Sequence, residues 1–282
     1  MTAPSVRGPR VVLVTGASSG IGEASARRLA RELGIELVLV ARRGERLRAL
    51  AGELPVRATF VAVDLTEPNA PSAILAHLEQ AHHGRLDLLV NNAGAGWRAT
   101  FADGGYANVR RTMELNFDAV VRLTEALLPS LRASAPSAIV NVASTAGRVA
   151  RGGSGAYSAS KFALVGWSDA LLAEERAHGV HVGLVLPGFI VTEGFPQREL
   201  VDRRLTGWLV GSVEAVAEAI VDAGLRGRAE RYVPRPYALA GIARLLAPGL
   251  VRGFLLGGGA AALTTRTAGD EAEKPAPGTY SA

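Results

Sequence analysis

The sequence contains no cysteine, and only two of its 31 basic residues are lysine. Without cysteine, a disulfide framework, a thiol nucleophile and a cysteine-ligated metal are all excluded. The absence also fits a reducing compartment, and we expect a cytoplasmic protein. None of the five histidines belongs to a His-x-x-x-His pair; they lie at positions 77, 82, 83, 178 and 181. We expect them at solvated helix ends and expect no metal site.

The chain also lacks dense blocks of charge and an apolar leader. Its net charge of +5 comes from arginines scattered along the chain, without the interleaved aromatic residues of a nucleic-acid surface. Residues 1–9 are short and polar and lack the apolar core of a secretory signal. We therefore expect no nucleic-acid partner and no export, and a flexible N-terminus over residues 1–9.

Short apolar segments alternate with helix-length segments along most of the 282 residues. The segments typical of strands are 10–14, 35–40, 57–63, 86–90, 137–143, 180–186 and 231–233. Helical patterns cover 20–33, 43–53, 69–83, 107–134, 157–178 and 212–226. Continuously apolar strands joined by crossover helices predict a single α/β domain over residues 10–235, a doubly wound (Rossmann-type) parallel sheet of about seven strands with helices on both faces. Ligands of such sheets bind at the carboxyl ends of the strands.

The composition changes after this domain. Residues 236–262 are apolar and rich in glycine, and they contain Arg244, Pro248 and Arg252. Two arginines in the bilayer and a proline in the helix would be costly, so we do not expect a membrane-spanning helix. We expect the segment to cover a cleft or pack against a partner subunit, and favour this over contact with a membrane surface. The polar tail 263–282 is predicted to be disordered.

A glycine-rich turn follows the first predicted strand and precedes a predicted helix. Its glycines permit a tight turn and close approach of a ligand, and the helix start offers free N–H groups to a pyrophosphate. The sequence therefore predicts a dinucleotide site at Gly16, Ser18, Ser19, Gly20, Ile21 and Gly22.

The end of the second predicted strand indicates which dinucleotide binds. An NAD site usually presents an acidic residue there, whereas this chain has Arg42 and Arg43. A guanidinium pairs well with a 2′-phosphate, so NADP(H) is favoured. Two alternatives stay open, namely that Arg42 begins a solvated helix and that the working cofactor is NAD(H).

Tyr157 and Lys161 lie four residues apart, so a helix places them on one face. An ammonium beside a phenol favours the phenolate and lowers its pKa. Lysine is also a compact charge on a flexible stem, which suits a proton relay better than arginine does. The pair therefore predicts a tyrosine general acid or base whose pKa is lowered by lysine, against the alternative of a surface lysine on an amphipathic helix.

With these motifs, the chain resembles a short-chain dehydrogenase/reductase (SDR) of the classical type from about residue 10 to 234. The motifs occur in order: TGASSGIG at 15–22, Asp64-Leu65, Asn91-Asn92-Ala93-Gly94, Asn116, Ser144, Tyr157 with Lys161, and Pro187-Gly188. By this resemblance Asn116, Ser144, Tyr157 and Lys161 are catalytic. Asn116 would hold a relay water, Ser144 would polarise a carbonyl, Tyr157 would exchange the proton, and Lys161 would also bind the nicotinamide ribose.

The resemblance also implies further cofactor contacts. Asp64 and Leu65 would contact the adenine, and the turn with Asn91, Ala93 and Gly94 would support the sheet and the adenosine side. The nicotinamide carboxamide would be held by Pro187, Gly188, Ile190 and Thr192. The family further implies a homo-oligomer, either a dimer or a tetramer.

Aromatic residues follow two of the predicted strands, where substrate-facing loops lie in such folds. They are Trp97, Phe101, Phe189, Phe195 and Trp208. We expect an apolar or bulky small-molecule substrate and a mobile lid at 189–211. The sequence thus predicts an NADP(H)-dependent reductase of a ketone or aldehyde. A non-catalytic NADPH sensor, a membrane-associated enzyme of lipid substrates and an NAD-dependent dehydrogenase remain alternatives.

Overall fold

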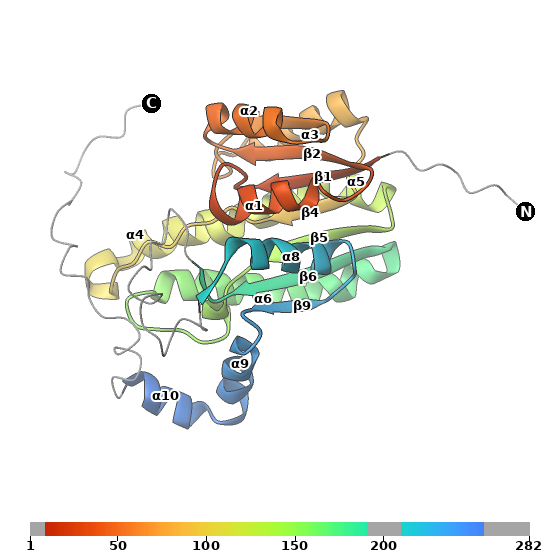
Figure 1. The fold of residues 1–282 in the computed structure, drawn as a ribbon. Helices are drawn as coiled ribbons and strands as arrows, with labels where there is room; N and C mark the ends of the chain where they lie inside the picture. Colours follow the sequence, from red (N-terminus) through yellow and green to blue (C-terminus); the bar gives the residue numbers. More distant parts are fainter. Residues whose placement is uncertain (1–8, 191–209, 257–282) are drawn as a thin grey trace, which may run out of the picture.

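A seven-stranded parallel sheet forms the centre of the computed structural model, which describes residues 9–190 and 210–256 (Figure 1). Its strand order is β3-β2-β1-β4-β5-β6-β9, so the order along the chain reverses between β1 and β4. The strands are β1 (Arg10–Thr15), β2 (Ile35–Ala41), β3 (Ala58–Ala62), β4 (Leu88–Asn91), β5 (Ser137–Val142), β6 (Val180–Pro187) and β9 (Glu230–Val233). A two-stranded parallel pair, β7 (Phe189–Ile190) with β8 (Val210–Gly211), lies beside the sheet's end. The predicted fold class is confirmed.

Helices cover both faces of this sheet. The helices are α1 (Gly20–Leu29), α2 (Gly44–Glu53), α3 (Ala70–His82), α4 (Phe101–Met113), α5 (Ala119–Ala133), α6 (Gly155–Glu175) and α8 (Val213–Gly224). Side chains of β1 alternate between two cores: Val12 and Val14 pack with α1, α2 and α8, whereas Val11 and Leu13 pack with α3, α5 and α6. This double burial explains why the strands read as continuously apolar segments.

The predicted single helix over 107–134 differs from the structure in two respects. Helix α4 begins earlier, at Phe101, and a π-helical turn over Glu114–Asp118 separates it from α5. The side chain of Asn116, inside this turn, bonds to the backbone of Ala95 in a different segment. A π turn inserts an extra residue into a helix and is often found at functional sites. Here it redirects Asn116 toward the strand-end loops.

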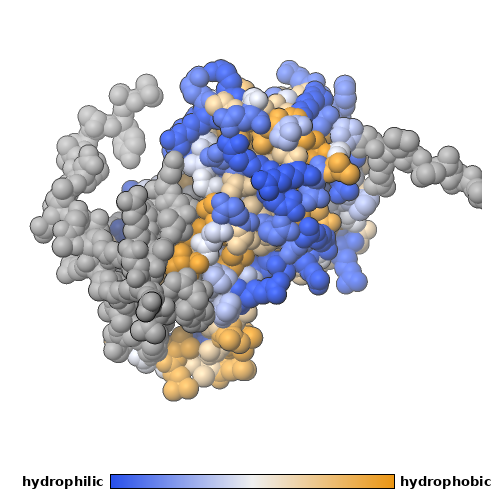
Figure 2. Space-filling model, viewed as in Figure 1, coloured by the Kyte–Doolittle hydropathy of each residue, from blue (hydrophilic) through white to orange (hydrophobic). Residues whose placement is uncertain are grey.

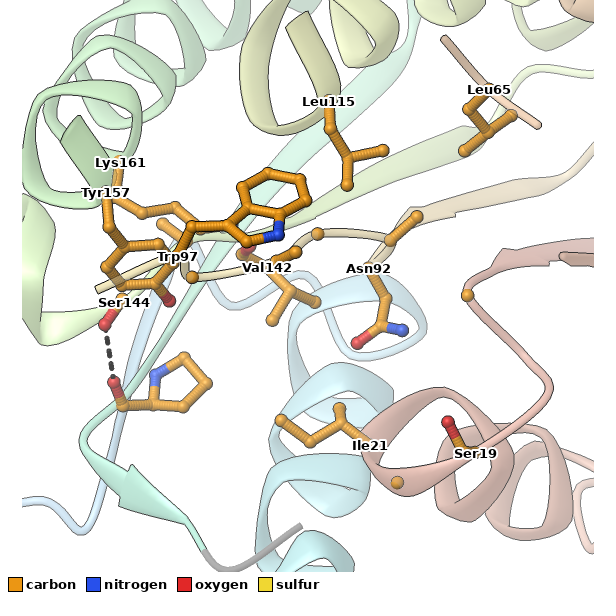
Figure 3. Close-up of a pocket in the computed structure, with 18 of the residues that line it drawn as sticks. Ser19, Ile21, Leu65, Asn92, Trp97, Leu115, Val142, Ser144, Tyr157 and Lys161 are labelled. Carbon is orange, nitrogen blue, oxygen red and sulfur yellow. Dashed lines mark hydrogen bonds between the residues drawn. The ribbon is translucent and has the colours of Figure 1, made fainter. Parts of the chain in front are cut away.

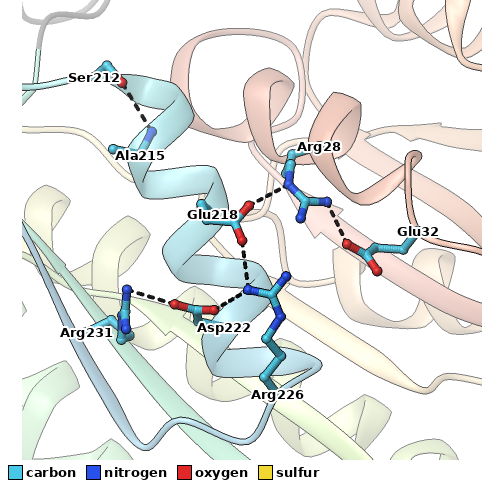
Figure 4. A network of polar contacts seen from close by, with 8 residues as sticks. All are labelled: Arg28, Glu32, Ser212, Ala215, Glu218, Asp222, Arg226 and Arg231. Carbon is cyan, nitrogen blue, oxygen red and sulfur yellow. Dashed lines mark hydrogen bonds and ion pairs between the residues drawn. The ribbon is translucent and has the colours of Figure 1, made fainter.

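An ion-pair network ties α1 to α8 and β9 (Figure 4). Arg28 bonds Glu218 at 2.6 Å and Glu32 at 2.7 Å, and Arg226 bonds Glu218 and Asp222. Arg231 of β9 reaches Asp222 at 2.7 Å. Arg28 and Glu218 are 190 residues apart, so their bond fixes the first helix of the domain against the last helix that packs on the sheet.

The C-terminal segment forms two helices, α9 (Tyr237–Leu246) and α10 (Pro248–Leu256), that extend beyond the sheet (Figure 1). Large apolar side chains are exposed on them, and Figure 2 shows this part of the visible face as hydrophobic. They are Leu239, Ile242, Leu245, Leu246, Leu250 and Leu256. Within the described ranges, no helix is long and apolar enough to cross a membrane. At the start of α9, Tyr237 packs on Phe189, which lines the cleft described below.

One histidine expected at a solvated helix end lies in the interior. His82 is 5% exposed; its ring is within hydrogen-bonding distance of Glu36 (3.0 Å) and Thr59 (3.1 Å). Burial lowers the pKa of His82, although the hydrogen bond with Glu36 opposes this. The expectation is wrong for His82 because α3 presents this position to β2 and β3. In the part of the chain that the structure describes, no group of three or more side chains is arranged to hold a metal ion.

Candidate active site

A cleft of about 920 Å³ lies at the carboxyl ends of the parallel strands. Its walls come from the turn after β1, the ends of β2 and β4, the loops after β5 and β6, and helix α6. The strand order reverses between β1 and β4, which is the point where doubly wound sheets bind their ligands. Figure 3 shows Ser19 and Ile21 at one end of this cleft and Ser144, Tyr157 and Lys161 at the other.

The glycine turn forms the first end because its backbone is tightly packed. Gly16 has a φ of +66°, and a Cβ built on Gly22 would lie 2.1 Å from the carbonyl oxygen of Gly16. No side chain fits there, so helix α1 begins in direct contact with the turn. The hydroxyl of Thr15 accepts hydrogen bonds from the N–H groups of Asn92 (2.9 Å) and Ala93 (3.0 Å). These bonds join the turn after β1 to the turn after β4.

Two arginines approach this end from the start of α2. Arg43 donates to the hydroxyls of Ser18 (3.0 Å) and Ser19 (2.6 Å), so its guanidinium lies on the glycine turn. Arg42 is largely exposed and lies 3.6 Å from a carboxylate oxygen of Asp64. Burial raises the pKa of Asp64, but hydrogen bonds from Thr66 and the charge of Arg42 outweigh this, so its pKa is lowered. This end of the cleft is therefore lined by two guanidinium groups and one carboxylate.

The second end gathers two hydroxyls and an ammonium. Ser144 follows β5; its Oγ donates to the carbonyl of Pro187 at 3.3 Å, shown as a dashed line in Figure 3, and interacts with the hydroxyl of Tyr157. Lys161 lies one turn after Tyr157 on α6 and is 4% exposed. Its Nζ donates to the carbonyl of Val142 at 2.9 Å and lies 5.8 Å from the centroid of the Tyr157 ring. Burial lowers the pKa of Lys161 to about 8.

The expectation that Lys161 lowers the pKa of Tyr157 is wrong for this structure. Burial raises the pKa of Tyr157 and outweighs the two influences that lower it, the hydrogen bond with Ser144 and the positive charge of Arg151. The helical spacing indicates only the neighbour on the same helix. The desolvation of the phenol and the charge of an arginine from a neighbouring loop arise from tertiary packing.

Asn116 is completely buried behind this end. Its Nδ2 donates to the carbonyl of Ala95 (2.9 Å) and to the Ser160 hydroxyl (3.1 Å), and its Oδ1 accepts from the N–H of Ala95 (2.9 Å). These contacts link the π turn, the loop after β4 and helix α6. Asn116 therefore does not line the cleft itself, and it fixes the position of the loop and helix that do.

The comparisons with known proteins agree with this geometry. The sequence profile of the short chain dehydrogenase family matches residues 10–200. The chain belongs to the short-chain dehydrogenase family. The chain is 32% identical over 220 residues to the ketoacyl reductase HetN of Nostoc sp., a match covering 76% of this chain and 75% of that protein. It is 34% identical over 191 residues to the bovine dehydrogenase/reductase SDR family member 7B, covering 64% of this chain and 58% of the relative's length.

A solved structure is also similar to this SDR. The crystal structure of L-sorbose reductase from Gluconobacter frateurii, complexed with NADPH and L-sorbose, superposes with a TM-score of 0.70 at 30% identity. The superposition covers 80% of this chain and 94% of that one. Membership of an oxidoreductase family, with reductases among the relatives, follows from these matches.

Most site residues predicted from the sequence of this SDR line the cleft. They are Gly16, Ser18, Ser19, Gly20, Ile21, Arg42, Arg43, Asp64, Leu65, Ala93, Gly94, Ser144, Tyr157, Lys161, Pro187, Gly188 and Ile190. Gly22 and Asn91 do not, and Asn91 instead bonds Thr124 and Asn141 within the sheet and helix core. Thr192, Phe195, Trp208 and most of the expected lid lie outside the described residues. Of the described aromatic candidates, Trp97 and Phe189 line the cleft, whereas Phe101 is 78% exposed on α4.

Sequence reasoning missed Arg151, which lines the cleft beside Phe189. It also missed Tyr237, whose ring lies 6.4 Å from that of Phe189. A positive charge six residues before Tyr157, in the loop that the motifs place at the substrate end, was a readable signal for Arg151. Tyr237 carried no such signal, because its contact depends on where the C-terminal helix packs.

Proposed function

We propose that this SDR is an NADP(H)-dependent reductase that interconverts a carbonyl and a secondary alcohol. The observation that carries the proposal is the convergence of Ser144, Tyr157 and Lys161 at one end of a cleft whose other end is a glycine-rich, arginine-lined turn. The named reductases among its relatives support the direction of the reaction.

The turn at the other end fits a dinucleotide. The crowding of Gly22 against Gly16 leaves the backbone accessible to a pyrophosphate, and helix α1 begins there with free N–H groups. Arg42, Arg43 and Ser18 are suited to hold a 2′-phosphate, because guanidinium groups form charge-assisted bonds with phosphate oxygens. Asp64 and Leu65 would face the adenine, and Pro187, Gly188 and Ile190 would hold the nicotinamide end. When bound, the nicotinamide cofactor supplies the hydride.

The residues of the second end would supply the proton and stabilise the charge. The hydroxyls of Ser144 and Tyr157 would hold the carbonyl oxygen and stabilise the negative charge that develops on it. Tyr157 would then give its proton to that oxygen, completing the alcohol. Its high pKa suits this role, because the phenol stays protonated at neutral pH. Lys161 would return a proton to Tyr157, and Asn116 would position the loop and helix on either side of the relay.

The test measures NADPH oxidation with a panel of aromatic and aliphatic ketones, for the wild type and for Tyr157→Phe. We expect the substitution to reduce kcat by about 100- to 10,000-fold, the usual range for loss of a general acid. Tyr106→Phe removes a phenol from a position on α4 that is 71% exposed and should leave kcat unchanged.

Two outcomes would contradict the proposal. Unimpaired turnover in Tyr157→Phe would remove Tyr157 from the chemistry. Tight NADPH binding with no turnover of any ketone or aldehyde would favour the rival function, a non-catalytic NADPH sensor.

Several further expectations stay predictions. They are a cytoplasmic location, a homo-oligomer, a C-terminal segment that covers a cleft or packs against a partner subunit, a substrate lid at 189–211, and an apolar or bulky substrate. Figure 2 shows the apolar surface that such a subunit contact would cover.

A further inference from the structure

Arg151 lies against an aromatic ring at the substrate end of the cleft, and a second ring supports the first. Its guanidinium carbon lies 4.5 Å from the centroid of the Phe189 ring, and the ring of Tyr237 packs on Phe189 at an angle of 64°. Stacking on a ring leaves the N–H groups at the edge of a guanidinium available as donors. Arg151 thus lines the cleft with its donor groups close enough to Tyr157 for its charge to lower the pKa of that phenol.

A second arginine is brought to the same place. The N–H of Ala99 donates to the carbonyl of Gly153 at 3.1 Å, which joins the loop after β4 to the loop before α6. This bond places Arg98, next to Ala99, near Arg151, close enough for repulsion between the two charges. Burial lowers the pKa of Arg151; the nearby hydroxyls of Tyr237 and Tyr157 oppose this, the charge of Arg98 adds to it, and the net shift is downward. The fold therefore keeps two positive charges close together, and their repulsion costs folding free energy.

No carboxylate among the described residues of the cleft compensates these charges. Two acidic side chains line the cleft, and each is paired with a different arginine. Asp64 lies 3.6 Å from Arg42, and Glu114 bonds Arg122 at 2.8 Å. Of the other lining arginines, Arg111 is held by Trp97 and Asn108. A desolvated cation beside a reacting centre is stabilised when a ligand brings the opposite charge.

We propose that Arg151, assisted by Arg98, forms an oxyanion subsite, so that the preferred substrate is a ketone carrying a carboxylate or a phosphate group. This inference rests on the proposed reductase function and specifies its substrate class. The anion would be held on the Arg151 fork while Ser144 and Tyr157 hold the carbonyl, and the apolar part of the substrate would contact Trp97 and Phe189. The competing explanation for the position of Arg151 is that its charge acts only on Tyr157 and binds no substrate anion.

The test uses pairs of related ketones, one anionic and one neutral. One pair is 2-oxo-4-phenylbutanoate and its ethyl ester, and the other is dihydroxyacetone phosphate and dihydroxyacetone. For the wild type with NADPH, we expect kcat/KM at least 10-fold higher for the charged member of a pair. The first pair reports a carboxylate and the second a phosphate, so the pair with the larger ratio identifies the anion.

Arg151→Met should remove this preference. We expect kcat/KM for the charged ketone to fall at least 10-fold, mostly through KM, and that for its neutral partner to change less than 3-fold. Arg151→Lys, which keeps the charge but loses the planar fork, should give an intermediate loss. Arg110→Met removes an equal charge from an exposed position on α4 outside the cleft and should leave both values unchanged. The Kd for NADPH should be the same in all variants.

The outcomes separate the two proposals. Equal losses on charged and neutral ketones in Arg151→Met would show that Arg151 acts on Tyr157, and would overturn the oxyanion subsite while leaving the reductase function intact. A weakened Kd for NADPH with unchanged charge preference would place Arg151 at the cofactor and would also overturn it. A wild type that turns over no ketone of either pair or of the wider panel would overturn both proposals.

Discussion

The two ends of the cleft differ in the atoms that form them, backbone at one end and side chains at the other. At the glycine turn, backbone atoms make the site: Gly22 is packed against Gly16, and Thr15 ties the turn to the loop after β4. At the other end, side chains from α6 and the loops after β5 and β6 converge, and α9 adds Tyr237 behind them. The charges also differ. Arg42 and Arg43 have protein partners, whereas Arg151 faces an aromatic ring and another arginine.

This difference indicates which properties of the protein are open to change. A backbone cradle tolerates little substitution, so the first end suits a ligand that is the same in many enzymes. Side-chain walls can be altered one residue at a time without moving the sheet, so the second end can carry specificity. We therefore expect substitutions at the first end to affect cofactor binding for every substrate, and those at the second end to affect catalysis or substrate choice.

At the second end, after Tyr157→Phe, the largest effect is expected for Ser144→Ala. One of the two hydroxyls that stabilise the negative charge on the reacting carbonyl oxygen would be lost, which should lower kcat by about 100- to 1,000-fold. The Kd for NADPH, measured by fluorescence titration, should stay within a factor of three of wild type. Ser72→Ala, at an exposed position on α3, is the matched control. A large loss of NADPH affinity in Ser144→Ala would erase the division between the two ends.

At the first end, Gly22→Ala should weaken binding of the cofactor. A Cβ at this position would lie 2.1 Å from the Gly16 carbonyl oxygen, so the turn must open. We expect the Kd for NADPH to weaken by more than about 10-fold, since backbone donors at a helix start lose their alignment. Gly52→Ala adds a Cβ with no neighbour within 4 Å and should bind normally. Normal NADPH binding by a correctly folded Gly22→Ala variant would place the dinucleotide elsewhere.

Arg43→Ala should distinguish the two dinucleotides. Loss of the guanidinium bonded to Ser18 and Ser19 should weaken NADPH binding by about 10-fold and NADH binding by less than 3-fold, because only NADPH carries the 2′-phosphate. Arg42→Ala is expected to act in the same direction, and Arg48→Ala, which lies outside the cleft, should have no effect. Equal losses for the two dinucleotides would contradict the preference for NADP(H).

The smallest expected effect concerns the stability of the protein without cofactor. Burial lowers the pKa of Lys161 from 10.5 to about 8, so between these values the unfolded chain binds one more proton than the folded chain. Stability should therefore rise as the pH approaches and passes the pKa of the folded state, by about 1 kcal/mol between pH 7 and pH 9. Urea denaturation at the two pH values should show this rise in the wild type and not in Lys161→Met. A rise of equal size in the variant would mean that other groups cause it.

Much of this protein could be predicted from local sequence patterns. The apolar segments predicted the strands, because strands buried on both faces must be continuously apolar. Gly16, Gly20 and Gly22 predicted the turn, because its tight backbone path admits few other residues. The spacing of Tyr157 and Lys161 predicted their shared helix face, because helical periodicity is local.

Tertiary structure alone decided the rest. The pKa of Tyr157 depends on its burial and on Arg151, which reaches it through the packing of a loop. Asn116 lies where it does because a π turn interrupts the helix that the sequence pattern predicted as continuous. The oxyanion subsite needs Arg98 and Arg151, which are 53 residues apart in the sequence, to lie near each other. The hydrogen bond from Ala99 to Gly153 joins their two loops. Sequence determined the sheet and its turns because local chemistry dictates them, whereas desolvation and like-charge proximity arise only when distant segments pack together.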